Sequence, residues 1–210
     1  MVTHSGRAVV DAPQDPRAQV TGLRFSEVMA GPFVLGADDP QAAVAQARDR
    51  FVLRATLVID DIRGFLADSS HAGRLTGDVT FPPLGRGVPV TAGHFNLFAP
   101  SLDPDLKLMV YVLSFAVGAE VYTLHGEKHV RRGSMLRGWP DTTTLHSRLY
   151  AGPEASGRVC GAGTLRITAA GFARQLLSFR PVNGTGATAR AAAMARFFTF
   201  FTRELLDSYL

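Results

Sequence analysis

Hydrophobic and polar residues alternate with a period of two along several stretches of the chain. In residues 21–35 one face of the expected strand carries Leu23, Phe25, Glu27, Met29, Gly31, Phe33 and Leu35. Residues 51–59 and 75–81 alternate in the same way. Because successive side chains of a strand point to opposite sides of the sheet, this pattern predicts strands with one buried face.

Similar stretches predict further strands, at residues 88–98, 106–117, 119–130, 141–150, 157–168 and 173–181. Turn residues such as Pro82-Pro83 and Gly152-Pro153 separate them. The connections are too short for parallel crossovers, so the sheet should be antiparallel, and a large sheet tends to close on itself. We therefore expect a mainly β fold, a lipocalin-like antiparallel barrel of about 8–10 strands.

A different spacing near the C-terminus predicts an amphipathic helix over residues 187–210. One face of this helix would carry Met194, Phe197, Phe198, Phe201 and Leu205, opposite Arg196, Arg203 and Asp207. We expect it to pack on the barrel, and the alternative is a helix for a membrane surface or a partner. Residues 39–50 predict a short helix or a loop, and residues 60–68 predict a helix with Asp60 or Asp61 as N-cap.

These elements predict one barrel domain over residues 19–210, preceded by a flexible arm over residues 1–18. The arm lacks the apolar core of a signal peptide, and the apolar run 108–119 is too short for a membrane-spanning helix. The arginines are scattered, which argues against nucleic-acid binding. Cys160 is the single cysteine and fits a reducing cytoplasm, while the richness in Ala, Arg and Gly suggests a bacterial genome.

Three charged residues fall on faces that the alternation assigns to the barrel interior. Glu27 lies between Phe25 and Met29, Lys128 shares a face with Leu124, and Asp141 shares a face with Leu145. An unpaired buried charge is very costly, so these groups should pair, change their pKa or meet a ligand. A bulge in any of the strands would reverse the assignment.

Glu27, Lys128 and Asp141 are therefore the candidate catalytic residues. Glu27 would act as general base or hydrogen-bond acceptor, Lys128 or Tyr111 would stabilise negative charge, and Asp141 would hold Lys128. The side chains that we expect to contact a ligand are Tyr111, Tyr122, Thr143, Phe25, Met29, His94 and Phe95. The alternative is a salt bridge that only sets the register of the strands.

No motif for a metal or a cofactor is found in the sequence. His125, Glu127 and His129 share a strand face, but that face should be exposed, so we expect surface residues and no metal. Residues 161–166 lack the third glycine of a dinucleotide fingerprint. Gly161 and Gly163 point inward, either to leave space for a ligand or to let the C-terminal helix pack closely.

Five short motifs, in order, resemble an accessory β-domain of cholesterol-oxidase-like flavoproteins in the glucose–methanol–choline oxidoreductase group. They are FSEVMAG (25–31), GHFNLF (93–98), MVYVLSF (109–115), YTLHGEK (122–128) and WPDTTTL (139–145). The flavin-binding part of such proteins has no counterpart in the chain. The resemblance therefore implies the handling of lipophilic molecules rather than an oxidase activity, and a separate flavoprotein as a possible partner.

Three functions follow from this interpretation. The first is a cofactor-free isomerase or cyclase that acts on a lipophilic molecule, polyketide, isoprenoid or steroid-like, inside the barrel. The second is a carrier of such a molecule, and the third is an accessory partner of a flavoprotein. A homodimer is the alternative to a flavoprotein partner. A Glu27 that reaches a cavity without a dedicated salt-bridge partner favours catalysis, whereas a fully paired Glu27 and a wholly apolar cavity favour carriage.

Overall fold

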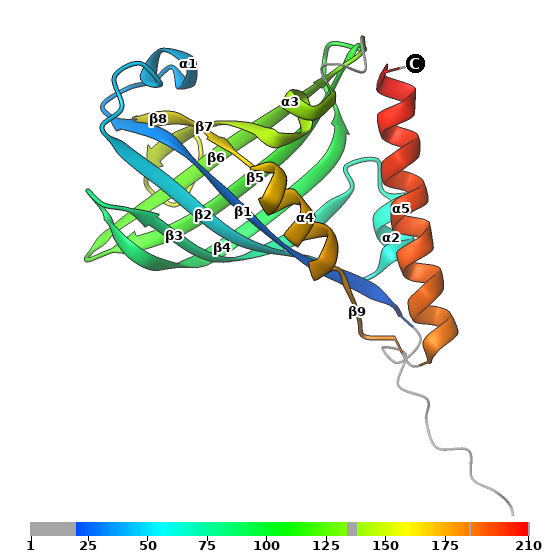
Figure 1. Cartoon of the computed structure of the whole chain (residues 1–210). Helices are drawn as coiled ribbons and strands as arrows, with labels where there is room; N and C mark the ends of the chain where they lie inside the picture. The colour runs from blue at the N-terminus through cyan, green and yellow to red at the C-terminus, as the bar shows by residue number, and fades with distance from the viewer. Residues whose placement is uncertain (1–19, 134–137, 185, 210) are drawn as a thin grey trace, which may run out of the picture.

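A computed structural model describes residues 20–133, 138–184 and 186–209 of the chain. The predicted N-terminal arm lies outside these residues. The described part contains a barrel of long, tilted strands, with one long helix standing across one end of it (Figure 1).

Eight strands form a closed antiparallel barrel, as the alternation predicted. They are β1 (Gly22–Leu35), β2 (Asp49–Ile59), β3 (Ala72–Phe81), β4 (Gly85–Pro100), β5 (Leu106–Val117), β6 (Glu120–Arg131), β7 (Thr144–Ala151) and β8 (Arg158–Arg166). Each strand pairs with the next, and β1 pairs with both β2 and β8. This last pairing closes the barrel, so that neither β1 nor β8 is left as an open edge.

A short helix replaces part of the barrel wall beside β1. Strand β1 pairs with β8 over residues 30–35 and with the short strand β9 (Arg180–Val182) over residues 22–24. Between β8 and β9 the chain forms α4 (Ala169–Ser178). The hydroxyl of Ser178 accepts from the backbone N–H of Ser26 at 2.8 Å, which is a bond that a neighbouring strand would otherwise make.

The strand predicted over residues 173–181 is therefore wrong for most of its length. Thr168 caps α4, because its hydroxyl accepts from the backbone N–H of Gly171 at 3.0 Å. Phe172, Leu176 and Phe179 follow at intervals of four and three residues, which is helical spacing rather than alternation. The cap and this spacing decide the local structure.

The other helices lie in the connections and at the C-terminus. They are α1 (Pro40–Ala43), α2 (Ile62–Ala67), α3 (Gly138–Thr143) and α5 (Ala187–Tyr209). Asp61 caps α2 by accepting from the backbone N–H of Arg63, which confirms the predicted helix. Because residues 141–143 belong to α3, the strand predicted over 141–150 begins only at Thr144.

Helix α5 covers one end of the barrel with the apolar face that its sequence predicted. Phe197 is 2% exposed, and its ring lies 5.9 Å from that of Phe25 and 5.3 Å from that of Phe179. On the opposite face Arg203 and Asp207 are exposed, and Nε of Arg203 lies 3.7 Å from Oδ2 of Asp207. None of the helices in the described residues is long and apolar enough to cross a membrane.

Aromatic rings fill the half of the barrel that lies away from α5. Phe33, Phe51 and Phe81 pack with ring centroids 5.0–5.5 Å apart. A Cβ atom on Gly163 would lie 2.5 Å from the ring of Phe33 and 2.3 Å from the carbonyl oxygen of Pro32. Gly163 therefore makes room for an aromatic ring, and not for a ligand or for the C-terminal helix.

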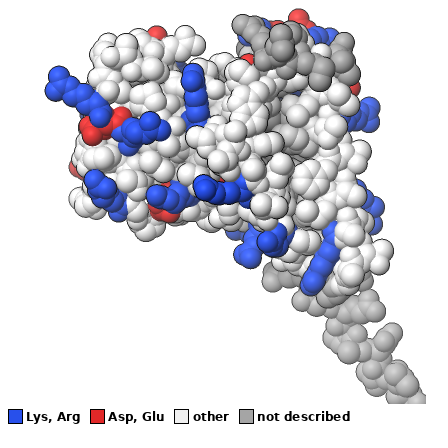
Figure 2. Space-filling view, viewed as in Figure 1, with Lys and Arg blue, Asp and Glu red and all other residues white. Residues whose placement is uncertain are grey.

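The surface shows where the positive charge lies. On the face that carries α4, Lys and Arg side chains clearly outnumber Asp and Glu, but they are scattered and do not merge into a continuous patch (Figure 2). This distribution agrees with the net charge of +4 and with the scattered arginines of the sequence.

Candidate functional site

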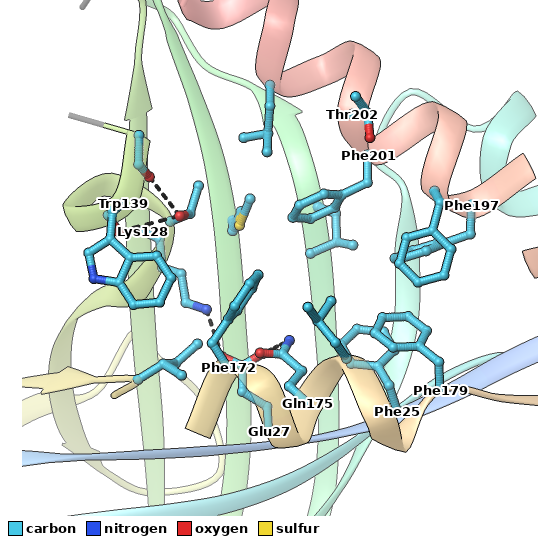
Figure 3. A pocket seen from close by; sticks show the side chains of 18 of the residues that line it. Phe25, Glu27, Lys128, Trp139, Phe172, Gln175, Phe179, Phe197, Phe201 and Thr202 are labelled. Atoms are coloured by element: carbon cyan, nitrogen blue, oxygen red, sulfur yellow. Dashed lines mark hydrogen bonds and ion pairs between the residues drawn. The ribbon is translucent and has the colours of Figure 1, made fainter. Parts of the chain in front are cut away.

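A cavity of about 380 Å³ lies where the barrel meets helices α3, α4 and α5 (Figure 3). The barrel and the start of its link to α4 contribute Phe25, Glu27, Leu97, Met109, Tyr111, Lys128 and Ile167. The helices, with Phe179 just after α4, contribute Gly138, Trp139, Thr142, Phe172, Gln175, Leu176, Phe179, Phe197, Phe198, Phe201, Thr202, Leu205, Leu206 and Tyr209. The cavity is thus built jointly by the interior of the barrel and by its helical cover.

Most of the cavity wall is apolar and aromatic. The rings of Phe25 and Phe179 stack at 4.4 Å, and those of Trp139 and Phe172 meet edge to face at 5.3 Å. Three of the lining residues are also among the exposed hydrophobic side chains of the described surface: Trp139 at 45%, Leu176 at 46% and Leu206 at 41%. These three residues mark the border between the cavity and solvent.

The polar part of the wall is centred on an ion pair between Glu27 and Lys128. The Lys128 Nζ atom lies 2.6 Å from Oε1 of Glu27, and both residues are 2% exposed. Glu27 comes from β1 and Lys128 from β6, so the pair crosses the interior of the barrel. The alternation correctly placed both charges inside, and the pairing explains how the fold tolerates them.

Tyr111 of β5 joins this pair by two hydrogen bonds. Its hydroxyl donates to Oε2 of Glu27 at 3.1 Å and accepts from Nζ of Lys128 at 3.2 Å. Burial, the negative charge of Glu27 and this hydrogen bond raise the pKa of Tyr111 well above its usual value of 10.0. The hydroxyl therefore stays protonated and remains a donor to the carboxylate.

Gln175 of α4 completes the group from the other side. Its Nε2 atom donates to Oε2 of Glu27 at 3.1 Å. The Oε1 atom of the same amide is buried and has no hydrogen-bond partner among the described residues. Sequence reasoning missed Gln175 because it assigned residues 173–181 to a strand; the capping residue Thr168 and the helical spacing after it were the signals for α4.

These contacts limit what Glu27 can do chemically. Its carboxylate accepts hydrogen bonds from Lys128, Tyr111 and Gln175, which between them engage both of its oxygens. Of the two conditions expected for carriage, the pairing of Glu27 is met, whereas the cavity is not wholly apolar.

Asp141 does not hold Lys128, which corrects the sequence-based expectation. It belongs to α3, and its carboxylate accepts a hydrogen bond from the hydroxyl of Tyr209 at 3.1 Å. Thr143 is buried, but its hydroxyl donates to the carbonyl oxygen of Trp139 at 2.6 Å. The helix rotates these side chains away from the directions that a strand would give them.

The remaining candidates are spread over the barrel. Phe25 lines the cavity, whereas Met29 and Phe95 are buried in the core outside the cavity lining. Tyr122 stacks on Phe115 at 5.9 Å and is not part of the cavity wall. His94 is exposed on the outer side of β4, so its position does not support a ligand contact inside the barrel.

The histidines of β6 lie on the outer surface, with Glu127 between them. Nε2 of His129 is 3.1 Å and Nε2 of His125 is 3.7 Å from the carboxylate of Glu127. Among the described residues, no group of three or more His, Cys, Asp or Glu side chains is arranged to hold a metal ion.

Comparison with known proteins gives no family for this chain. No protein-family model matches the sequence, and neither the curated proteins nor the solved structures yield a match. Nothing in these comparisons links the chain to flavoprotein oxidoreductases, so the resemblance described above stays a prediction. The function has to be argued from the cavity itself.

Proposed function

We propose that the protein binds a lipophilic small molecule in the cavity between the barrel and helices α3, α4 and α5. The observation that carries this proposal is a mostly apolar cavity of about 380 Å³ with a polar corner formed by Glu27, Lys128, Tyr111 and Gln175. Small-molecule sites are typically of this size, with mostly hydrophobic walls and few polar groups that orient the ligand.

Carriage is the form of binding that the polar corner favours. Glu27 is engaged by three donors, and Lys128 is held by Glu27 and Tyr111. Such a network orients a ligand without a group that is poised to take a proton from it. We further propose that the protein works in the cytoplasm, in line with its single cysteine.

Binding can be tested with the neutral fluorescent probe N-phenyl-1-naphthylamine. We expect one probe to bind per chain, and we expect Leu176→Asp to weaken binding at least about tenfold, because the probe would cover a charged group. Leu177 is the matched control: it is the next residue of α4, is 75% exposed and does not line the cavity. Leu177→Asp should leave the affinity unchanged, and equal losses in both variants would contradict the assigned site.

A cofactor-free isomerase or cyclase is the second candidate. The ammonium group of Lys128 and the hydroxyl of Tyr111 both line the apolar cavity, where they would stabilise negative charge that develops on a substrate. In this function Glu27 would take the proton, as the sequence first indicated. The donors around Glu27 make it the weaker of the two proposals.

The ring opening of 5-nitrobenzisoxazole separates the two candidates. In this reaction a base removes the ring C–H proton while the N–O bond breaks, and a cyanophenolate is released. Carriage predicts no acceleration by the protein beyond that of buffer. An acceleration that Glu27→Gln abolishes, while the variant still binds the naphthylamine probe, would support the enzyme instead.

A further inference from the structure

Exposed apolar side chains gather around the mouth of the cavity, which Trp139, Leu176 and Leu206 border. Eight large hydrophobic side chains are exposed among the described residues, and five of them lie at this mouth or on the elements next to it. Besides the three border residues, these are Leu177 on α4 and Val28 on β1, the strand that runs alongside α4. Exposed apolar side chains that gather in one place mark an interaction surface.

The elements beside this mouth also carry the excess of positive charge. Residues 155–203, which cover β8, α4, β9 and most of α5, contain seven arginines and no lysine, aspartate or glutamate. This segment has a formal charge of +7, whereas the rest of the chain has −3. Figure 2 shows the same bias, because Lys and Arg outnumber Asp and Glu on the face that carries α4. A partner for this surface therefore has to be negatively charged.

Two of the arginines lie next to Leu177. Arg174 is exposed and precedes Leu177 by three residues on α4, so the two side chains share one side of the helix. Arg180 folds back on the end of α4, where its Nη1 atom donates to the carbonyl oxygens of Leu177 and Phe179, both at 2.8 Å. Neither arginine forms an ion pair with a residue that the structure describes. Apolar and positively charged groups thus lie side by side at the mouth.

This combination fits a lipid surface better than a protein. On a membrane, apolar side chains enter the boundary between headgroups and acyl chains, while arginines bind the negative groups of anionic lipids. An acidic protein would need carboxylates at positions that match scattered arginines, whereas lipids diffuse to each arginine separately. A second copy of this chain would bring the same arginines face to face, because a twofold interface uses the same patch on both subunits.

We infer that the mouth of the cavity docks onto a bilayer that contains anionic lipids, with Trp139, Leu176, Leu177 and Leu206 among the headgroups. The opening of the cavity then faces the phase in which lipophilic molecules are most concentrated, so that a ligand passes between bilayer and cavity without crossing water. The passage of a ligand rests on the proposed binding function. The docking itself depends only on the surface.

Cosedimentation with lipid vesicles tests the docking. It compares vesicles of phosphatidylcholine with mixed vesicles in which about one third of the lipid is phosphatidylserine. We expect the protein to bind the mixed vesicles at least about tenfold more tightly, and we expect added salt to weaken this binding. Equal binding to both kinds of vesicle, or binding to neither, would overturn the inference.

Leu177→Asp separates the docking from the proposed function. Leu177 is 75% exposed and does not line the cavity. The variant should bind the mixed vesicles about tenfold more weakly, since it loses an apolar group and gains a negative charge. Its affinity for N-phenyl-1-naphthylamine in vesicle-free solution should stay unchanged. If the unmodified chain binds vesicles but no probe, the cavity function alone fails; if it binds the probe but no vesicles, the docking alone fails.

Val44→Asp is the matched control for vesicle binding. Val44 is 46% exposed and follows α1, which lies at the end of the barrel away from α5 (Figure 1). The variant changes the net charge as Leu177→Asp does, but it should bind the mixed vesicles within about twofold of the unmodified chain. Equal losses in the two variants would show that net charge alone decides, and would contradict docking through the mouth.

Trp139 reports which face docks, because it is the single tryptophan of the chain and is 45% exposed at the mouth. Bromine atoms quench tryptophan on contact, so mixed vesicles with brominated acyl chains should quench the fluorescence of the bound protein. Protein that cosediments without quenching is bound through another face, which would overturn the inference. Polyglutamate, at the same concentration of negative charge, stands for an acidic protein. Complete release of the chain from the vesicles by polyglutamate would assign the surface to such a partner instead.

Discussion

Nζ of Lys128 lies 2.6 Å from Oε1 of Glu27, and the two residues are separated by 101 positions in the sequence. The pair joins β1 to β6 inside the barrel, and Tyr111 and Gln175 fix its geometry. A buried ion pair of this kind contributes little net stability but makes the loss of either partner costly.

Replacing one partner of the ion pair should destabilise the fold strongly. Glu27→Gln or Lys128→Met leaves the other group buried with weaker partners, and we expect each to lower the free energy of unfolding by about 3 kcal/mol or more. The double variant Glu27→Gln/Lys128→Met should recover most of this loss. Urea unfolding measures all three, and additive losses in the double variant would show that the pair is not coupled.

Tyr111 should make the protein sensitive to alkali. Its pKa is raised in the folded protein, mainly by burial, so the folded state holds a proton that the unfolded chain releases near pH 10.0. The stabilisation is therefore complete below pH 10.0 and is lost as the pH rises above it. Tyr111→Phe should flatten this dependence in unfolding experiments, and an unchanged alkaline slope would refute the assignment.

His146 should contribute the opposite dependence at low pH. Burial, the nearby His129 and Arg166 hold the pKa of His146 below its usual 6.5, so the unfolded chain binds the proton more readily. The stability that His146 contributes is present above pH 6.5 and is lost as the pH falls below that value. Denaturant unfolding at pH 7.5 and 5.5 measures how much the free energy of unfolding falls between the two pH values. This fall should be smaller for His146→Phe than for the unmodified chain, and an equal fall in both would contradict the prediction.

Gly163 should tolerate no side chain. A Cβ atom there would lie 2.3 Å from the backbone oxygen of Pro32 and 2.5 Å from the ring of Phe33, so Gly163→Ala should cost about 2 kcal/mol or more. Gly171→Ala is the control, because Gly171 lies in α4 and the nearest atom to its added Cβ is a side-chain hydroxyl, that of Thr168 at 3.2 Å, and not a backbone atom. Thermal unfolding compares the stability of the two variants. A loss of stability in Gly163→Ala as small as that in Gly171→Ala would refute the close packing at Gly163.

The barrel could be predicted because its strands alternate strictly. Leu23, Phe25 and Met29 are all at most 3% exposed, and the same rule put Glu27 inside. The rule also placed Lys128 correctly. The helix over residues 60–68, with Asp60 or Asp61 as its N-cap, and the apolar face of α5 could also be predicted, since each depends on residues that are neighbours in the sequence.

What could not be predicted depends on helices that interrupt the alternation. Asp141 was paired with Lys128 because residues 141–143 were assigned to a strand, whereas they form the end of α3. Gln175 was missed because α4 was also taken for a strand. In both cases a local capping or helical preference overrides an apparent period of two, and it moves side chains that decide how the cavity is built.

Trp139 offers the most direct measurement of ligand binding in the cavity. It is the single tryptophan of the chain, lines the cavity and is 45% exposed at its border. Excited at the tryptophan band, the protein should transfer energy to bound N-phenyl-1-naphthylamine. We predict that transfer saturates at one probe per chain and that decanol, used as a competing lipophilic molecule, reverses it. Transfer in Leu177→Asp should be unchanged, and transfer in Leu176→Asp should be much weaker. Transfer that never saturates, or that decanol leaves intact, would contradict a lipophilic ligand site in this cavity.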